Sequence, residues 1–460
     1  MKKIFLFLLL LITIETVFSK SYLYNIKLTK EKIPLFIKLT KIYKIDIWKD
    51  GIPINSNFNF LIKKEVKEKV EESLNLLNIP FEIQKNFNLE NLIEKEKKNL
   101  NSNETNFFKK FHTYSEYEIW LNSIINLYPN LTEKISIGKS FENREIFGIK
   151  ITKKTNFKKS SIVITSGMHS REWAAITTSF WIIFDLLKNS ETKTKFLLET
   201  IEWHFIPIVN PDGFIYTLTT DRLWRKSRSI NSGSNCIGTD MNRNWDFQWN
   251  SGGSSTDPCS EIYRGSNPNS EIEVKGLVDY ISSLSNVKVY FDIHSFSQLI
   301  MRPYGYSKLV PPDEIEMSFI NNKISQNITN TFSKFYQPGR ISVVIYEASG
   351  SGVDWCYGNK GIFSFAAEVR PQFIEEGGFL LPADQIIPTG QEMMNGIIEM
   401  GKYFVNYTLI SNPNVSPIVS KIKPINSNQT NNTTYIINGS NQIKFGYLIY
   451  FILILLLILD

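Results

Sequence analysis

The chain contains the run SIVITSGMHSREW at residues 161–173, where an apolar segment gives way to polar residues at a glycine. The short apolar run 161–166 predicts a buried strand that stops at Gly167. A helix is expected to follow over residues 174–187. A strand, a turn and a helix in this order are the repeating unit of an α/β domain, and His169 and Glu172 fall on the turn.

Two further apolar runs place polar residues at strand ends in the same way. Residues 287–293 predict a strand followed directly by His294, and residues 363–369 predict a strand that carries Glu368 near its end. Such strands alternate with helical segments across residues 107–410, which predicts one α/β domain there. Open α/β sheets bind ligands at the carboxyl ends of their strands. We therefore expect two histidines and two carboxylates to meet at one edge of the sheet.

The spacing of His169 and Glu172 suits a metal site. Residues three apart in a turn that enters a helix can face the same way, and His294 would supply a third ligand. Two histidines and one glutamate leave the fourth position of a tetrahedral zinc ion open for water. A His-x-x-Glu pair alone is more often structural, but the chain has only four histidines. His112 and His204 lie at no matching strand end and are expected to be core residues.

The composition excludes several other classes of protein. Apolar residues make up 42% and charged residues 21%, as in an ordinary soluble globular core. The 51 basic and 45 acidic residues give a net charge of +6, without a block of like charge, so no nucleic-acid partner is expected. Three cysteines are too few for a disulfide-dense scaffold or a cysteine-rich zinc finger.

Both ends of the chain carry hydrophobic segments. Residues 1–19 combine a basic start, an apolar run and small residues before residue 20, the layout of a secretory signal peptide. Residues 441–460 end in an apolar run that is shorter than the roughly 20 residues of a membrane span. Small residues at 438–440 favour the signal for a GPI anchor, with a short span as the alternative. We therefore expect an extracellular or cell-surface protein that is attached to the membrane through its C-terminus.

The remaining segments divide the chain further. Residues 20–96 predict a small domain with strands at 22–28 and 81–83 and an amphipathic helix at 63–77. A polar connector over residues 95–103 is expected to be flexible and accessible to proteases. Residues 411–440 are rich in Asn, Pro and Ser, and most of the Asn-x-Ser/Thr sequons lie between Asn406 and Asn438. They predict a glycosylated stalk.

Seven motifs carry a resemblance to a known family. The motif GMHSREW at 167–173 resembles the zinc signature of the metallocarboxypeptidases of the carboxypeptidase A/B type. The match continues in the family's order through DRLWRK (221–226), DMNRNW (240–245), HSFSQ (294–298), YEASG (346–350), VDW (353–355) and EVR (368–370). The resemblance implies a mixed, open, twisted sheet with helices on both faces, preceded by a small α+β antiparallel propeptide domain.

The resemblance implies a role for each matching residue. His169, Glu172 and His294 would hold one Zn²⁺, as the two histidines and one glutamate of carboxypeptidase A do. Asp240 would orient His169. Glu368 would be the general base and Arg225 the stabiliser of negative charge on the scissile carbonyl. The residues implied to bind the substrate are Arg171, Asn242, Arg243 and Tyr346, and the last three would hold its terminal carboxylate.

Specificity is expected to depend on Val353, which stands where the family sets the preference for the last side chain. A neutral, apolar residue there implies a pocket for aliphatic or aromatic side chains, lined also by Ile341 and Ile345, with Gly305 leaving room for a ring. Phe296, Ala366 and the order Ser351-Gly352 depart from the family's usual residues. They put the fine specificity in doubt and leave the reaction class unchanged.

The resemblance also implies a disulfide and a precursor. Cys236 and Cys259 match the family's single disulfide, and Cys356 is left over. Residues 20–96 resemble the activation segment that covers the cleft in the zymogens, with residues 97–106 as the activation linker. A separate protease would then activate the precursor.

The residues predict a zinc exopeptidase that removes single C-terminal amino acids from peptides and proteins with a free C-terminus. Two alternatives remain at this point. One is a zinc hydrolase that acts on a non-peptide amide, and the other is a surface binding protein that keeps the fold without turnover.

Overall fold

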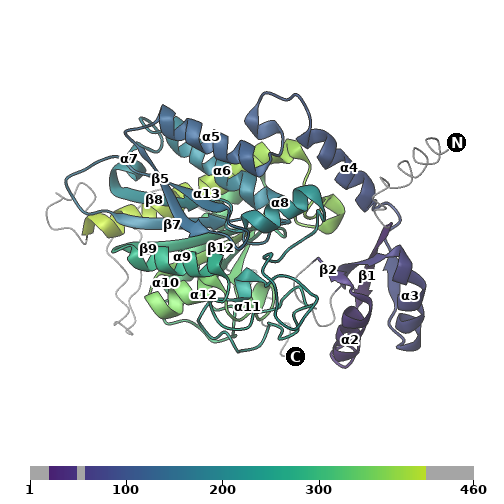
Figure 1. Cartoon of the computed structure of the whole chain (residues 1–460). Helices are drawn as coiled ribbons and strands as arrows, with labels where there is room; N and C mark the ends of the chain where they lie inside the picture. The colour runs from purple at the N-terminus through teal and green to yellow at the C-terminus, as the bar shows by residue number, and fades with distance from the viewer. Residues whose placement is uncertain (1–19, 49–56, 411–460) are drawn as a thin grey trace, which may run out of the picture. The chain divides into compact units, whose positions relative to one another are not determined.

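An eight-stranded mixed sheet forms the centre of the larger part of the chain in the computed structural model (Figure 1). The structure describes residues 20–48 and 57–410, so the expected signal peptide, stalk and tail lie outside the described residues. The strands of this sheet are β5 (Thr132–Lys139), β6 (Glu145–Ile151), β7 (Ser160–Ser166), β8 (Ile201–Ile206), β9 (Val287–Ser295), β10 (Leu299–Arg302), β11 (Gln337–Arg340) and β12 (Phe363–Val369).

Four neighbouring strands in the middle of this sheet run parallel. The strand order is β11-β10-β12-β9-β7-β8-β6-β5, and β12, β9, β7 and β8 pair in parallel. Strand β10 joins β12 in antiparallel fashion, and β6 and β5 form an antiparallel edge beyond β8. The carboxyl ends of the three expected strands, β7, β9 and β12, therefore lie next to one another, as the sequence predicts.

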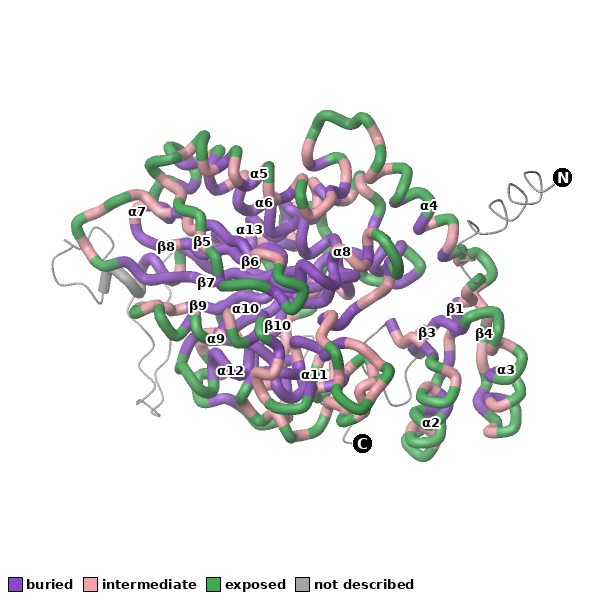
Figure 2. Tube along the Cα trace, viewed as in Figure 1, coloured by how far each residue is buried: buried purple, intermediate pink, exposed green. Residues whose placement is uncertain are grey.

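Helices cover both faces of the sheet, and its central strands are largely buried (Figure 2). Ile162 and Ile164 of β7 face one layer and Val163 faces the other, as the two-residue period of a strand requires. One layer contains α5 (Tyr114–Leu127), α6 (Trp173–Lys188), α10 (Glu314–Phe332) and α13 (Ile386–Ile410). The opposite layer contains α9 (Ile272–Ser283) and α12 (Gly352–Lys360). This confirms the expected fold class.

Shorter elements connect these layers. They are α7 (Lys195–Thr200), α8 (Pro211–Thr219), α11 (Ile341–Val344) and the 3-10 turns Phe107–Lys109, Met241–Arg243, Ile374–Glu376 and Ala383–Gln385.

A disulfide joins Cys236 to Cys259, as the resemblance implies, and Cys356 is a buried free cysteine. Among the helices that the structure describes, none is both long enough and apolar enough to cross a bilayer.

The N-terminal residues form a separate antiparallel sheet with its own core. Its strands are β1 (Ser21–Lys27), β2 (Asp46–Ile47), β3 (Asn57–Lys63) and β4 (Phe81–Ile83), in the order β2-β3-β1-β4. The helices α2 (Ile33–Tyr43) and α3 (Lys67–Leu76, preceded by the 3-10 turn Lys64–Val66) pack on it. Val70 and Leu74 of α3 are buried one turn apart, as the amphipathic spacing predicts.

The connector to the larger part differs from the expectation of a flexible segment over residues 95–103. Helix α4 (Leu89–Leu100) continues through most of it. Leu89, Ile93 and Glu96 are buried on one side of α4, at helical spacing. The carboxylate of Glu96 pairs with the buried guanidinium of Arg222, which offsets part of the cost of burial; burial nevertheless raises the pKa of Glu96. The polar composition of residues 95–103 gave no indication that a helix with one buried face continues into this segment.

Candidate active site

The end of β7 delivers the first part of the site. Gly167 follows β7 with φ = +65°, a left-handed conformation that favours glycine, and a Cβ atom there would lie only 3.0 Å from the Ile176 side chain. The chain then turns through His169 to Glu172, and α6 begins at Trp173. His294 lies on the adjacent strand β9, and Glu368 of β12 is its direct partner in the parallel register. His294 and Glu368 therefore stand on the same face of the sheet.

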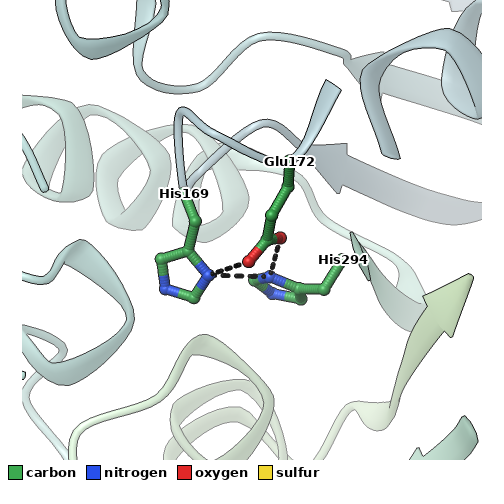
Figure 3. A group of neighbouring side chains, drawn as sticks. All are labelled: His169, Glu172 and His294. Carbon is green, nitrogen blue, oxygen red and sulfur yellow. Dashed lines mark hydrogen bonds and ion pairs between the residues drawn. The ribbon is translucent and has the colours of Figure 1, made fainter. Parts of the chain in front are cut away.

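His169, Glu172 and His294 point toward one another (Figure 3). Each offers a ligand atom, and these atoms all lie within 4.8 Å of one another among buried side chains. The Nδ1 atom of His169 lies 2.8 Å from one carboxylate oxygen of Glu172, and the Nδ1 atom of His294 lies 3.0 Å from the other. The two Nδ1 atoms are 3.1 Å apart. This convergence suits a single cation that all three residues could hold.

Two buried carboxylates hold the opposite sides of the imidazole rings. Asp240 Oδ1 lies 3.1 Å from His169 Nε2, a position from which it could take the orienting role that the family resemblance implies. Asp292 Oδ2 lies 2.8 Å from His294 Nε2, and its other oxygen accepts a hydrogen bond from Thr165. The Nε2 atoms are thus engaged, and both Nδ1 atoms are directed inward.

Asp292 is missing from the sequence-based site. The available signal was its spacing, because residues two apart on a strand share a face, and Asp292 precedes His294 by two.

Arginines adjoin the metal-binding group. Arg225 donates from Nε and Nη2 to Asp240 Oδ2, at 3.2 and 3.0 Å, and its Nη1 lies 3.9 Å from Glu172. Burial by itself raises the pKa of Asp240, but the charges of Arg225 and Arg243 outweigh it and hold the pKa of Asp240 well below its usual range. Asp240 therefore stays ionised and keeps both Arg225 and His169 in place.

A second group of expected residues lies around the turn that follows Asp240. Arg243 Nη2 donates to the hydroxyl of Tyr346 at 2.6 Å, and its Nε donates to the carbonyl of Gly253. The Asn242 amide lies 3.4 Å from His294 Nε2, and its oxygen accepts from the backbone of Gly352 at 3.1 Å. Asn242 thus lies beside His294, and Arg243, which follows it in the chain, holds the hydroxyl of Tyr346.

The expected specificity residues lie in the apolar layer on the same side of the sheet. Val353 is buried in the first turn of α12, in one cluster with Ile341, and the half-buried Ile345 packs against that cluster. A Cβ atom on Gly305 would lie 3.2 Å from Ile341, so these positions are neighbours. The adjacent Asp354 carboxylate accepts hydrogen bonds from the backbone amides of Gly305 and Tyr306. These bonds tie the loop at Gly305 to the helix that carries Val353.

Residues of the N-terminal sheet contact this region directly. Asp46 Oδ1 accepts a hydrogen bond from Arg171 Nη1 at 3.2 Å. Trp48 is buried against the rings of Phe296 and Phe379, at centroid distances of 6.4 and 5.2 Å. Neither Asp46 nor Trp48 could be predicted from the sequence, because their contacts depend on how the N-terminal sheet packs against the larger part of the chain.

The two remaining histidines are core residues, as expected. A ring nitrogen of His112 lies 2.7 Å from the carbonyl of Phe107, and the ring stacks on that phenylalanine. His204 Nδ1 lies 2.7 Å from the hydroxyl of Tyr280. Both are buried, and burial lowers the pKa of each ring.

Comparison with known sequences identifies a family for this chain. A family model described as zinc carboxypeptidase matches residues 117–396. Carboxypeptidase A2 of Rattus norvegicus is 40% identical over 292 residues, which are 63% of this chain and 69% of that protein. Carboxypeptidase A1 of Mus musculus is 35% identical over 378 residues, 79% of this chain and 88% of that protein.

Solved structures give the same result for the fold. The crystal structure of thrombin activatable fibrinolysis inhibitor superposes with a TM-score of 0.78 at 30% identity, over 85% of this chain and all of that one. The carboxypeptidase A of Helicoverpa armigera superposes with a TM-score of 0.76 at 27% identity, over 85% of this chain and 98% of that one.

Proposed function

The chain belongs to the zinc carboxypeptidase family, and we propose that it is secreted as an inactive precursor whose mature form prefers apolar or aromatic C-terminal residues. Its general activity follows from the family: it is a zinc-dependent hydrolase that removes C-terminal residues from peptides. The observation that supports this hydrolase activity is the inward convergence of two imidazole Nδ1 atoms and one carboxylate, which could hold the zinc ion. Hydrolysis of an N-blocked dipeptide that ends in Phe tests it.

The donor set fits the one Zn²⁺ that the family implies. His169, Glu172 and His294 are buried, and Asp240 and Asp292 hold the outer nitrogens of the two imidazoles. Carboxylates in these positions fix the tautomer and the orientation of zinc-binding histidines. When bound, zinc acts as a Lewis acid on the scissile carbonyl and lowers the pKa of its water toward about 7.

Glu368 is proposed to move the protons of the reaction. It stands opposite His294 on the neighbouring strand, on the face that carries the metal-binding group. A carboxylate there can take a proton from the attacking water and later pass it to the departing amine. Arg225 is proposed to stabilise the negative charge on the carbonyl oxygen, because Asp240 already holds its guanidinium beside Glu172.

The terminal carboxylate of the substrate is proposed to bind Asn242, Arg243 and Tyr346. The planar guanidinium of Arg243 can pair a carboxylate through two parallel hydrogen bonds. Arg243 Nε donates a hydrogen bond to the carbonyl of Gly253, which fixes the orientation of the guanidinium. Its Nη2 donates to the hydroxyl of Tyr346. A clamp for a free carboxylate next to the metal group would restrict cleavage to the last peptide bond. Arg171 is proposed to contact the preceding part of the substrate.

The precursor proposal rests on contacts made by the N-terminal sheet. Asp46 holds Arg171, and Trp48 covers Phe296 and Phe379, so these side chains are engaged before any substrate arrives. The ion pair of Glu96 with Arg222 holds α4 to the larger part. Similarity to carboxypeptidase A1 spans 79% of the chain, more than residues 107–410 alone would provide.

We expect cleavage between residues 97 and 106 to release an activity that the full precursor lacks. The physical reason is that a separated N-terminal domain can dissociate, which frees Arg171 and Phe296. The measurement compares the hydrolysis rate of the precursor with that of the trimmed protein at equal zinc content. Asp46→Asn in the uncut precursor removes the ion pair with Arg171 and leaves the chain intact, so it separates the loss of this one contact from cleavage itself. A precursor as active as the trimmed form would contradict the zymogen proposal.

The proposed membrane attachment concerns residues outside the described part of the chain. The small residues at 438–440 and the apolar end at 445–459 support a GPI anchor. Phospholipase specific for GPI is expected to release the protein from intact cells that express it. A variant that ends at residue 440 should appear in the medium without treatment. Retention on phospholipase-treated cells would favour an uncleaved membrane span instead.

A further inference from the structure

The loop between α4 and the larger part has a composition that bears on which protease processes the precursor. Its residues 101–106 read NSNETN, with three asparagines and neither lysine nor arginine. Five of these six residues are exposed, and Ser102 is half-buried. In the part of the chain that the structure describes, the backbone amides of residues 103–105 donate no hydrogen bond. A protease can therefore bind this loop in an extended conformation while breaking fewer hydrogen bonds than elsewhere in the connector.

The lysines before the loop lie on a helix that is fixed on both sides of them. Lys97 and Lys98 belong to the last turn of α4. One residue earlier, Glu96 is buried in its ion pair with Arg222. One residue later, the Asn99 side chain donates to the carbonyl of Lys109 and accepts from the amide of Phe111, at 3.1 and 3.0 Å. Cleavage after either lysine therefore requires these contacts to break and the helix end to unwind.

The lysines after the loop are held to the core of the larger part. Lys109 and Lys110 lie between Phe108 and Phe111, which are both buried. The carbonyl of Lys109 accepts from Asn99, and Lys110 Nζ reaches the carbonyl of Ser102. Extension of this segment into a protease would expose both phenylalanines. The basic residues thus flank the loop on fixed segments, and the loop itself offers asparagine.

We propose that residues 101–106 are the processing site of the precursor and that the processing enzyme recognises an asparagine carboxamide, not a basic side chain. This inference rests on the zymogen proposal. Asn103 lies in the middle of the loop, so hydrolysis of the Asn103–Glu104 amide needs the least unwinding at either end. Water adds across that bond, leaving a carboxylate on Asn103 and an amine on Glu104. A carboxamide offers both a donor and an acceptor, which a complementary pocket can distinguish from an ammonium group.

The same asparagine also belongs to a glycosylation sequon. Asn103, Glu104 and Thr105 form Asn-x-Thr, and a glycan would be attached to the side-chain nitrogen that such a protease must read. Glycosylated chains would therefore resist cleavage after Asn103, and unglycosylated chains would be cut there. Thr105→Ala separates the two effects, because it removes the sequon and keeps all three asparagines.

The test digests the full precursor carrying Thr105→Ala with an asparagine-specific cysteine endopeptidase and, in parallel, with trypsin. Mass spectrometry maps the new termini, and peptidase activity is followed in the same samples. We expect cleavage after Asn103 to be at least about tenfold faster than any tryptic cleavage between residues 95 and 110. The matched control adds Asn103→Gln, which should abolish the cleavage after residue 103 and leave the tryptic rate unchanged.

Tryptic cleavage after Lys97 or Lys98 at an equal or higher rate would overturn the inference, as would unchanged cleavage of the control. The activity readout keeps the two proposals apart. A cut after Asn103 without a gain in activity would contradict the zymogen proposal alone. A gain in activity with trypsin alone would contradict the asparagine proposal and leave the zymogen proposal in place.

Discussion

Glu368→Gln is expected to lower kcat by about 10²–10⁴-fold while zinc binding and thermal unfolding stay unchanged. The substitution keeps the size and most of the hydrogen-bonding ability of the side chain, but it removes the group that accepts the proton. The three residues proposed to hold zinc are not altered. Because Glu368 lies on the face that carries His294, we expect the loss to appear in kcat far more than in KM.

The measurement combines steady-state kinetics on an N-blocked peptide, zinc content and a thermal melt of the trimmed protein. Glu191→Gln is a suitable control, because Glu191 is an exposed carboxylate that pairs at the surface with Lys153 and Lys195. It should turn over like the unmodified enzyme. Near-normal rates in the Glu368 variant would remove this residue from the mechanism.

Peptides that end in Phe, Tyr, Leu or Met are expected to be cleaved at least about a hundredfold faster than otherwise identical peptides that end in Arg, Lys, Asp or Glu. An apolar side chain gains on the order of 2 kcal/mol by leaving water, which corresponds to about thirtyfold. A charged side chain placed near Val353, Ile341 and Ile345 would meet no opposite charge from these residues and would pay for its lost hydration.

Val353→Asp is expected to shift the preference toward Lys and Arg by supplying that charge. Val353→Thr is the matched control, since it has nearly the same shape and introduces no charge. It should weaken cleavage of Phe peptides without any gain for Arg. Ala366 and the order Ser351-Gly352 depart from the family's usual residues and are expected to reduce the size of the shift. The ratio of kcat/KM for peptides that differ only in the last residue decides the matter, and faster release of Arg than of Phe by the unmodified enzyme would contradict the apolar pocket.

The parts of the structure that could be predicted from the sequence depend on local patterns. The apolar runs at 161–166, 287–293 and 363–369 each form a strand, because a fully buried parallel strand must be apolar on both faces. Because the carboxyl ends of parallel strands meet at one edge of a sheet, His169, Glu172 and His294 could be predicted to lie close together. Their ligand atoms do lie within 4.8 Å of one another. The roles of Arg225, Asn242 and Tyr346 came from the family resemblance, since an isolated polar residue in a loop carries no signal of its own.

The parts that could not be predicted depend on contacts between distant segments. Asp46 and Trp48 lie in an unremarkable stretch, and only the packing of the N-terminal sheet places them at Arg171 and Phe296. The connector at 95–103 looked flexible because eight of its nine residues are polar, yet helix α4 continues to Leu100 and Glu96 faces a buried arginine more than a hundred residues away. Asp292 was overlooked although the two-residue period of its strand pointed to it.

The measurement that tests the proposed site most directly is zinc content determined together with hydrolysis of an N-blocked dipeptide ending in Phe, before and after chelation. We expect one zinc ion per trimmed chain, loss of hydrolysis when a chelator removes it, and recovery when Zn²⁺ is added back. His294→Ala should neither retain the ion nor recover. A chain that hydrolyses the dipeptide at full rate without zinc, or that holds zinc at His169, Glu172 and His294 and does not hydrolyse it, would contradict the assignment of a zinc carboxypeptidase site.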